Sequence, residues 1–230
     1  MKLLRAGIVL VLGCLLLNGC SLGGDIETLR EKVIAAARWE SLNSLANKFI
    51  WLQANAQNGD NYTLEVRADE SIKPQTLSYK GKSNITITLT GIDVNRTISL
   101  SSNGAMFTVD SGVTLVLDNN ITLRGHSSNT GSLVRVDSSG TLIMNNGSTV
   151  TGNTSYDGGV FIQNGTFTMN GGEISGNIGD GVFIQNGTFT MSGGEISGNT
   201  RYGVYMPGGT FTMNGGEISG NIGRGVRVSG

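Results

Sequence analysis

The sequence predicts an all-β chain that folds as a right-handed parallel β-helix, with coils of about 22 residues and an N-terminal amphipathic helical cap. Three observations carry this prediction: a repeat at a fixed interval, alternation of apolar and polar residues within each repeat, and glycine or asparagine at each break. Alternation with period two is typical of half-buried strands, and repeats of this length stack into solenoids. We expect the solenoid to occupy residues 60–230, with regular repeats from about residue 158.

The composition fits many short strands joined by tight turns. Glycine contributes 36 of 230 residues, more than twice its usual share, whereas charged residues make up only 14%. The formal net charge is −1, without the basic excess of a nucleic-acid binder, so we expect no nucleic-acid partner. Glycine lacks the three-residue period of collagen, and the regular apolar residues argue against disorder.

The N-terminus has the pattern of a secretory signal. Two basic residues, Lys2 and Arg5, precede an apolar stretch too short for an ordinary transmembrane helix. The following Leu17-Asn18-Gly19-Cys20 resembles a bacterial lipobox. That resemblance implies a signal peptide over residues 1–19, lipidation of Cys20, a linker over 20–24 and attachment to a membrane through acyl chains.

Two alternatives to this anchor remain. Cleavage before Cys14 also fits the pattern but leaves three leucines on the mature end, and a plain signal peptide with an incidental cysteine is the simpler interpretation. Cys14 and Cys20 are the only cysteines, so lipidation of Cys20 excludes a disulfide. Ser21 is non-acidic, which by analogy with lipoprotein sorting favours the outer membrane.

Residues 25–58 have a helical pattern instead. Apolar residues recur at steps of three and four from Ile26 to Leu52, Asp25 is a candidate N-cap, and a break is expected near 41–44. The helix is a candidate partner-binding or membrane-surface element. We favour a cap, because the end of a stack of strands exposes an open core and unpaired edges.

The repeat is most regular in the C-terminal third. The block Gly165-Thr-Phe-Thr-Met-Asn-Gly-Gly-Glu-Ile-Ser-Gly-Asn177 recurs at 187–199 with one change and at 209–221 unchanged. Upstream, 107–125 aligns without gaps to 134–152. One unit contains three short strands, whose contour suits a closed triangular coil that stacks on the next at about 4.8 Å. The six-residue period of left-handed helices is absent, which favours the right-handed form.

Stacked coils place equivalent residues in rows along the axis. We expect a buried phenylalanine row and an asparagine row at one corner, formed by Phe167, Phe189 and Phe211 and by Asn177, Asn199 and Asn221.

These repeats resemble those of polymorphic outer-membrane proteins. Phe167-Thr-Met-Asn170 and Phe211-Thr-Met-Asn214 match the F-x-x-N motif of that family, and Gly171-Gly-Glu-Ile174 is similar to its companion motif. The resemblance implies a surface-exposed, adhesive β-helix. The chain also resembles repeat-bearing bacterial lipoproteins with pectate-lyase-like folds, a fold group that includes polysaccharide lyases.

The first candidate site is a row of glutamates on an outer face, formed by Glu173, Glu195 and Glu217. Carboxylates about 4.8 Å apart repel one another, and a bound divalent cation would offset that repulsion. The alternative, which we favour, is a solvated charge row that keeps the face soluble. His126 lies in a loop without an acid or nucleophile nearby in the sequence, so we expect no catalytic residue and no cofactor.

The second candidate site is an outward aromatic row with neighbouring amides, suited to carbohydrate or protein binding, and comprises Phe161, Phe183, Tyr205, Gln163 and Gln185. The alternative is that a loop or a neighbouring protomer covers it. The last coil has no polar cap, so we expect an end-to-end contact there unless the sequence is truncated.

Together these features predict a non-catalytic, lipid-anchored β-helix at the bacterial outer membrane or cell surface that binds a host glycan or matrix protein. The alternatives are a polysaccharide lyase or glycan-binding protein, and a purely structural envelope spacer. The alternative location is the periplasmic face.

Overall fold

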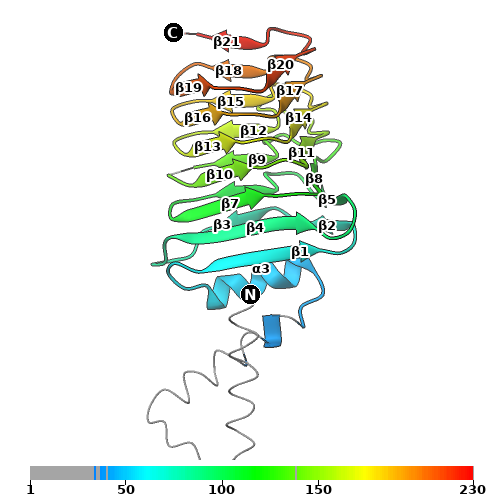
Figure 1. Cartoon of the computed structure of the whole chain (residues 1–230), viewed down its shortest axis with the longest axis vertical. Coiled ribbons are helices and arrows are strands. Elements are labelled where there is room, and N and C mark those ends of the chain that lie inside the picture. The colour runs from blue at the N-terminus through cyan, green and yellow to red at the C-terminus, as the bar shows by residue number, and fades with distance from the viewer. Residues whose placement is uncertain (1–33, 35–36, 40, 138, 230) are drawn as a thin grey trace, which may run out of the picture. The chain divides into compact units, whose positions relative to one another are not determined.

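The computed structural model describes residues 34, 37–39, 41–137 and 139–229. Within them the chain forms a parallel β-solenoid whose coils stack along one axis (Figure 1). The predicted signal peptide (1–19), the linker (20–24), the lipidation site Cys20 and the N-cap Asp25 lie outside the described residues.

Three sheets of seven parallel strands run along the solenoid, and successive coils add one strand to each sheet. The first sheet contains β1 (Asn61–Val66), β4 (Ile85–Gly91), β7 (Val113–Leu117), β10 (Thr141–Met144), β13 (Thr166–Met169), β16 (Thr188–Met191) and β19 (Thr210–Met213). The second contains β2 (Glu70–Ile72), β5 (Arg96–Leu100), β8 (Ile121–Arg124), β11 (Ser148–Thr151), β14 (Glu173–Ser175), β17 (Glu195–Ser197) and β20 (Glu217–Ser219). The third contains β3 (Gln75–Leu77), β6 (Phe107–Val109), β9 (Val134–Val136), β12 (Val160–Ile162), β15 (Val182–Ile184), β18 (Val204–Met206) and β21 (Val226–Val228). We call them the first, second and third sheets.

Coil length varies along the chain. One row of the first sheet runs through Leu64, Leu89, Leu117, Met144, Met169, Met191 and Met213, and the interval along the chain is shortest between the last three members. The predicted period of about 22 residues holds for the last coils, and the predicted alignment of 107–125 with 134–152 is confirmed by the strand register. The upstream coils are longer, and the average is closer to 25. The extra residues lie in the corners: the segment between β8 and β9 covers 125–133, whereas that between β14 and β15 covers 176–181.

The core is built from rows of identical or similar side chains. Phe167 and Phe189 are fully buried, and their rings stack with centroids 4.5 Å apart and planes 4° from parallel. Phe211 continues the row, 4.9 Å from Phe189. The predicted stacking of the phenylalanine row is confirmed, because parallel pairing in register places equivalent residues directly above one another, but Phe211 is only half-buried.

The asparagine row is also confirmed, and it is longer than predicted. Asn177 donates from Nδ2 to Asn199 Oδ1 at 3.0 Å, and Asn199 donates to Asn221 Oδ1 at 2.9 Å. Upstream, the Asn153 backbone N–H donates to Asn177 Oδ1 at 3.0 Å, and Asn129 Nδ2 donates to Asn153 Oδ1 at 2.8 Å. This row satisfies buried backbone groups at a corner, where the sheet ladders do not reach.

The helix α3 (Leu45–Asn55) follows the break expected at residues 41–44, which are not helical. Ser44 Oγ accepts from the Asn47 N–H at 3.3 Å, as an N-cap does. From Phe49 onward the helix contacts the first coils: the Phe49 ring lies 5.5 Å from that of Phe107, and the Trp51 ring lies 6.1 Å from that of Tyr62. Within the described part of the chain, no helix has the length and apolar character needed to cross a membrane.

Candidate functional site

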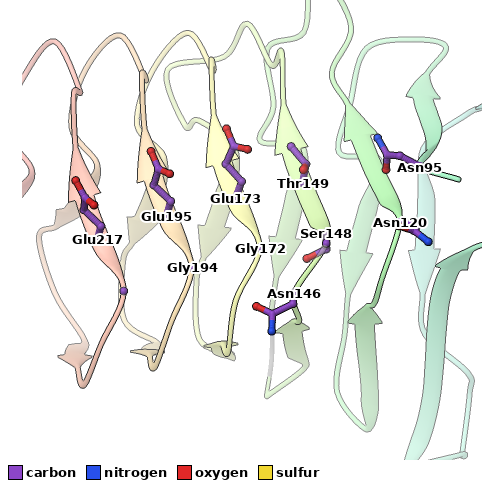
Figure 2. A pocket seen from close by; sticks show the side chains of 12 residues that line it. Asn95, Asn120, Asn146, Ser148, Thr149, Gly172, Glu173, Gly194, Glu195 and Glu217 are labelled. Atoms are coloured by element: carbon purple, nitrogen blue, oxygen red, sulfur yellow. The ribbon is translucent and has the colours of Figure 1, made fainter.

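A groove of about 800 Å³ runs across successive coils along the second sheet (Figure 2). Its lining consists only of asparagine, glycine, serine, threonine and glutamate: Asn95, Asn120, Asn146, Gly147, Ser148, Thr149, Gly172, Glu173, Gly194, Glu195, Gly216 and Glu217. The lining therefore contains acidic and neutral polar groups but no basic side chain.

The glutamates form the row that the sequence predicts. Glu173 pairs with Glu195 and Glu195 with Glu217 in the parallel register, and all three side chains are exposed. Thr149 occupies the same position one coil earlier, and Figure 2 shows the three carboxylates and Thr149 on the same side of the sheet. The glutamates follow glycines such as Gly194, whose φ of +86° is costly for other residues and turns the chain sharply into the strand.

The arrangement does not support a cation site at this row. Each coil contributes one carboxylate, so the three groups lie along a line instead of converging on one point. Among the described residues, no group of three or more His, Cys, Asp or Glu side chains is placed to hold a metal ion. The row is better described as a line of exposed negative charge along the groove.

The aromatic row lies on the third sheet, in the register that the sequence predicts. Phe161 pairs with Phe183 and Phe183 with Tyr205, with ring centroids 5.0 and 5.1 Å apart. Arginines continue the row at both ends: Arg135 pairs with Phe161 and lies 4.8 Å from its ring centroid, and Arg227 pairs with Tyr205 at 5.5 Å. The row thus consists of three neighbouring rings, of which Phe183 and Tyr205 are stacked, with a guanidinium group at each end.

This stacking changes what the row offers to a ligand. Phe161 is only 6% exposed, so the exposure predicted for it is not found; Arg135 and Phe183 lie against it. Phe183 and Tyr205 are half-buried, and their planes are within 21° of parallel, so the rings face each other. A sugar binds aromatic side chains through their faces, and the facing sides of the Phe183 and Tyr205 rings are in contact with each other, whereas the Phe161 and Phe183 rings are tilted by 59°.

The two glutamines of the predicted strip differ in their surroundings. Gln163 is half-buried and its Oε1 accepts a hydrogen bond from Arg135, whose Nε also donates to Asp137 at 2.7 Å. Gln185 is exposed. Arg135 therefore covers the strip at one end.

A second group of aromatic and basic side chains adjoins the C-terminal end of this row. The Tyr202 ring lies 5.7 Å from that of Tyr205, and Arg201 and Arg227 lie 5.3 and 5.0 Å from the Tyr202 centroid. Arg227 also donates to the Tyr202 hydroxyl. The aromatic rings and guanidinium groups hold one another in place.

One buried carboxylate anchors this group. Asp180 is fully buried; it accepts from the Tyr202 N–H at 3.1 Å and from Arg201 Nη1 at 3.3 Å. Burial raises the pKa of the Asp180 carboxyl, while the Tyr202 N–H and the Arg201 charge act in the opposite direction.

The arginines and Tyr202 were not among the site residues predicted from the sequence. The signal for two of them is nonetheless present, because Val134-Arg-Val136 and Val226-Arg-Val228 share the alternating pattern of Val160-Phe-Ile162 with which they align. Tyr202 and Asp180 lie in a corner, where no strand pattern marks the position of a side chain. His126, the only histidine, is half-exposed, and its Nδ1 contacts Ser128 in the same loop.

Comparisons of this chain with protein-family models, with curated proteins and with solved structures found no match. The parallel β-solenoid is therefore defined by its own strand pairing and core rows.

Proposed function

We propose that this protein is a non-catalytic, lipid-anchored scaffold of the bacterial outer membrane or cell surface, of the adhesin type, which displays binding faces for a host glycan or matrix protein. The anchor would be Cys20. The solenoid would serve as a rigid support on which each coil adds one more copy of an outward side chain.

The observation that carries the proposal is the groove along the second sheet. Its row of glutamates extends over three coils without a break, and the glycines beside it leave the backbone accessible. A long polar groove of this kind suits an extended ligand that runs along the axis, rather than a compact small molecule.

Protease treatment of intact cells tests the location. If the solenoid is outside the cell, external protease removes it while a periplasmic protein in the same cells stays intact. Protection of the solenoid until the outer membrane is opened would contradict the adhesin proposal and favour a periplasmic spacer.

Binding to arrays of host glycans and matrix proteins then tests the groove. We expect a ligand whose binding is lost in E173Q/E195Q/E217Q and retained in a variant altered at three exposed positions of the first sheet, T166S/T188S/T210S. Formation of unsaturated products from acidic polysaccharides, measured as new ultraviolet absorbance, would contradict the non-catalytic assignment and favour a lyase.

The anchor has its own test. The variant C20S is expected to lose metabolic labelling with a radioactive fatty acid and to leave the membrane fraction, whereas C14S keeps both properties. Labelling that persists in C20S would contradict the assignment of the anchor to this residue.

A further inference from the structure

The three most regular coils can be aligned with one another residue by residue. The segments 160–181, 182–203 and 204–225 are equal in length and agree over most of their sequence. Apart from Ser192, every difference among them falls in two places: the corner triplets 178–180, 200–202 and 222–224, and the segment 205–208. The corners lead directly into the third sheet, so these differences gather on one side of the solenoid.

Exposure alone does not explain this distribution. Thr166, Thr188 and Thr210 are exposed and identical, as are the three glutamates of the groove. Stacking requires the same residues in each coil only at core and turn positions. A face that differs between otherwise identical coils is therefore one whose side chains serve something other than stacking.

The residues that differ on this face, together with Arg227 of the following strand, are of types that dominate protein interfaces. The face, which we call the Tyr–Arg face, comprises Arg201, Tyr202, Tyr205, Arg224 and Arg227. Tyrosine and arginine are the residue types enriched at the energetic centres of such interfaces. Apolar surface lies at the same corners, because Ile178 is 49% exposed and Ile222 is 79% exposed.

The face carries positive charge. Between residues 199 and 229 there are three arginines and a single acidic residue, Glu217, which lies in the groove on the second sheet. Asp180 pairs with Arg201 from a fully buried position, and the charge of Arg227 also acts on its carboxyl group. Guanidinium groups held on aromatic rings are preorganised to bind carboxylates through two parallel hydrogen bonds.

We propose that the Tyr–Arg face is a docking surface for an acidic polypeptide segment. This rests on the proposed function of the solenoid as a binding scaffold and names a face and a partner for it. A polypeptide fits better than an acidic glycan, because the stacked rings offer few free faces to a sugar, whereas exposed isoleucines suit apolar side chains that alternate with acidic ones.

The test uses the full chain in detergent micelles with immobilised poly-L-glutamate as the probe and hyaluronan, a carboxylated glycan, as the comparison. We expect R201Q/R224Q/R227Q to weaken binding to poly-L-glutamate at least tenfold. The matched variant K73Q/K80Q/R124Q removes the same charge from exposed positions elsewhere on the solenoid and is expected to bind within twofold of the unaltered chain.

A charge-neutral variant separates the face from general electrostatics. Tyr202→Ser is expected to weaken binding at least threefold without a change in net charge, because Arg201 and Arg227 lose the ring that orients them. The coil tolerates this change, since neighbouring coils carry Gly158, Asp180 and Arg224 at the equivalent position.

Three results would overturn the proposal. The first is an equal loss of binding in R201Q/R224Q/R227Q and K73Q/K80Q/R124Q, and the second is unchanged binding in Tyr202→Ser. The third is hyaluronan binding that is as tight as poly-L-glutamate binding and is lost in R201Q/R224Q/R227Q and Tyr202→Ser. The last result would assign the face to an acidic glycan. Failure of the proposed function gives a different result. If the solenoid is protected from protease on intact cells but still binds poly-L-glutamate, the docking surface is supported and its partner lies within the envelope.

Discussion

At the level of single residues, buried asparagines hold each coil to the next. Asn199 is fully buried: its Nδ2 donates to the Ile174 carbonyl at 3.1 Å, and its Oδ1 accepts from the Asn177 backbone N–H at 3.1 Å. Each of these backbone groups would lie unpaired without the amide. An asparagine side chain stabilises the corner because its amide both donates and accepts hydrogen bonds where no water can replace it.

Asn199→Ala should therefore lower the free energy of unfolding by about 2 kcal/mol or more, because buried groups left unpaired cost about 1–3 kcal/mol each. Urea unfolding followed by circular dichroism measures the loss. Asn214→Ser is the matched control: Asn214 is exposed, and serine occurs at the equivalent position 192, so a change within about 0.5 kcal/mol is expected. Equal losses in the two variants would contradict a special role for the buried row.

The buried carboxylate of Asp180 predicts a pH dependence. Since burial raises its pKa above the usual value of 3.8, folding favours the protonated form. The stabilising contribution of this group is complete below pH 3.8 and is lost as the pH rises through the folded-state pKa. Asp180→Asn removes the titration, so the unaltered chain should lose stability relative to this variant between pH 3 and pH 7. Unfolding curves at both pH values check the sign, and a relative gain by the unaltered chain would contradict the prediction.

At the level of elements, α3 is the packing partner of the first coils. Phe49 is 2% exposed and its ring contacts Phe107, whereas its neighbour Ile50 is 69% exposed. The amphipathic pattern of the helix was visible in the sequence, and so was its start after residues 41–44. What the pattern could not supply was the partner of each apolar side chain, since Phe107 lies far along the chain on the third sheet.

Phe49→Ala should cost about 3–5 kcal/mol, the usual loss for a buried phenylalanine, and should expose the apolar end of the stack. Ile50→Ala changes an adjacent residue of the same helix and should alter stability by no more than about 0.5 kcal/mol. Thermal unfolding of the two variants side by side provides the measurement. Similar losses in both would contradict the special role of Phe49, because alanine raises helix propensity at either position and only the buried contact distinguishes the two residues.

At the level of the whole molecule, parallel stacking turns each repeated residue into a row that spans several coils. For apolar and amide residues the row is stabilising, as the phenylalanine and asparagine rows demonstrate. For the glutamates it is not, because like charges about 4.8 Å apart repel by about 1 kcal/mol per neighbouring pair in water. The same geometry therefore both builds the core and concentrates negative charge along the groove.

This repulsion should depend on salt. E173Q/E195Q/E217Q should be more stable than the unaltered chain at low ionic strength, by about 2 kcal/mol for the two neighbouring pairs, and the difference should shrink as salt screens the charges. Urea unfolding at about 10 mM and 1 M salt gives both values, which correspond to Debye lengths of about 30 and 3 Å. A difference that is unchanged by salt would show that the charges do not interact.

The sequence by itself determined the solenoid, its three strands per coil and the residues of its regular rows. It could do so because three nearly identical coils must place equivalent residues in equivalent positions, which fixes the register without further information. The tertiary structure alone decided the lengths of the first coils, the extension of the asparagine row to Asn129 and Asn153, and the burial of Phe161, whereas the gap-free alignment of 107–125 with 134–152 already gave the register of one upstream coil. Those outcomes depend on corners of unequal length and on arginine side chains from neighbouring coils, and such contacts exist only once the coils are stacked.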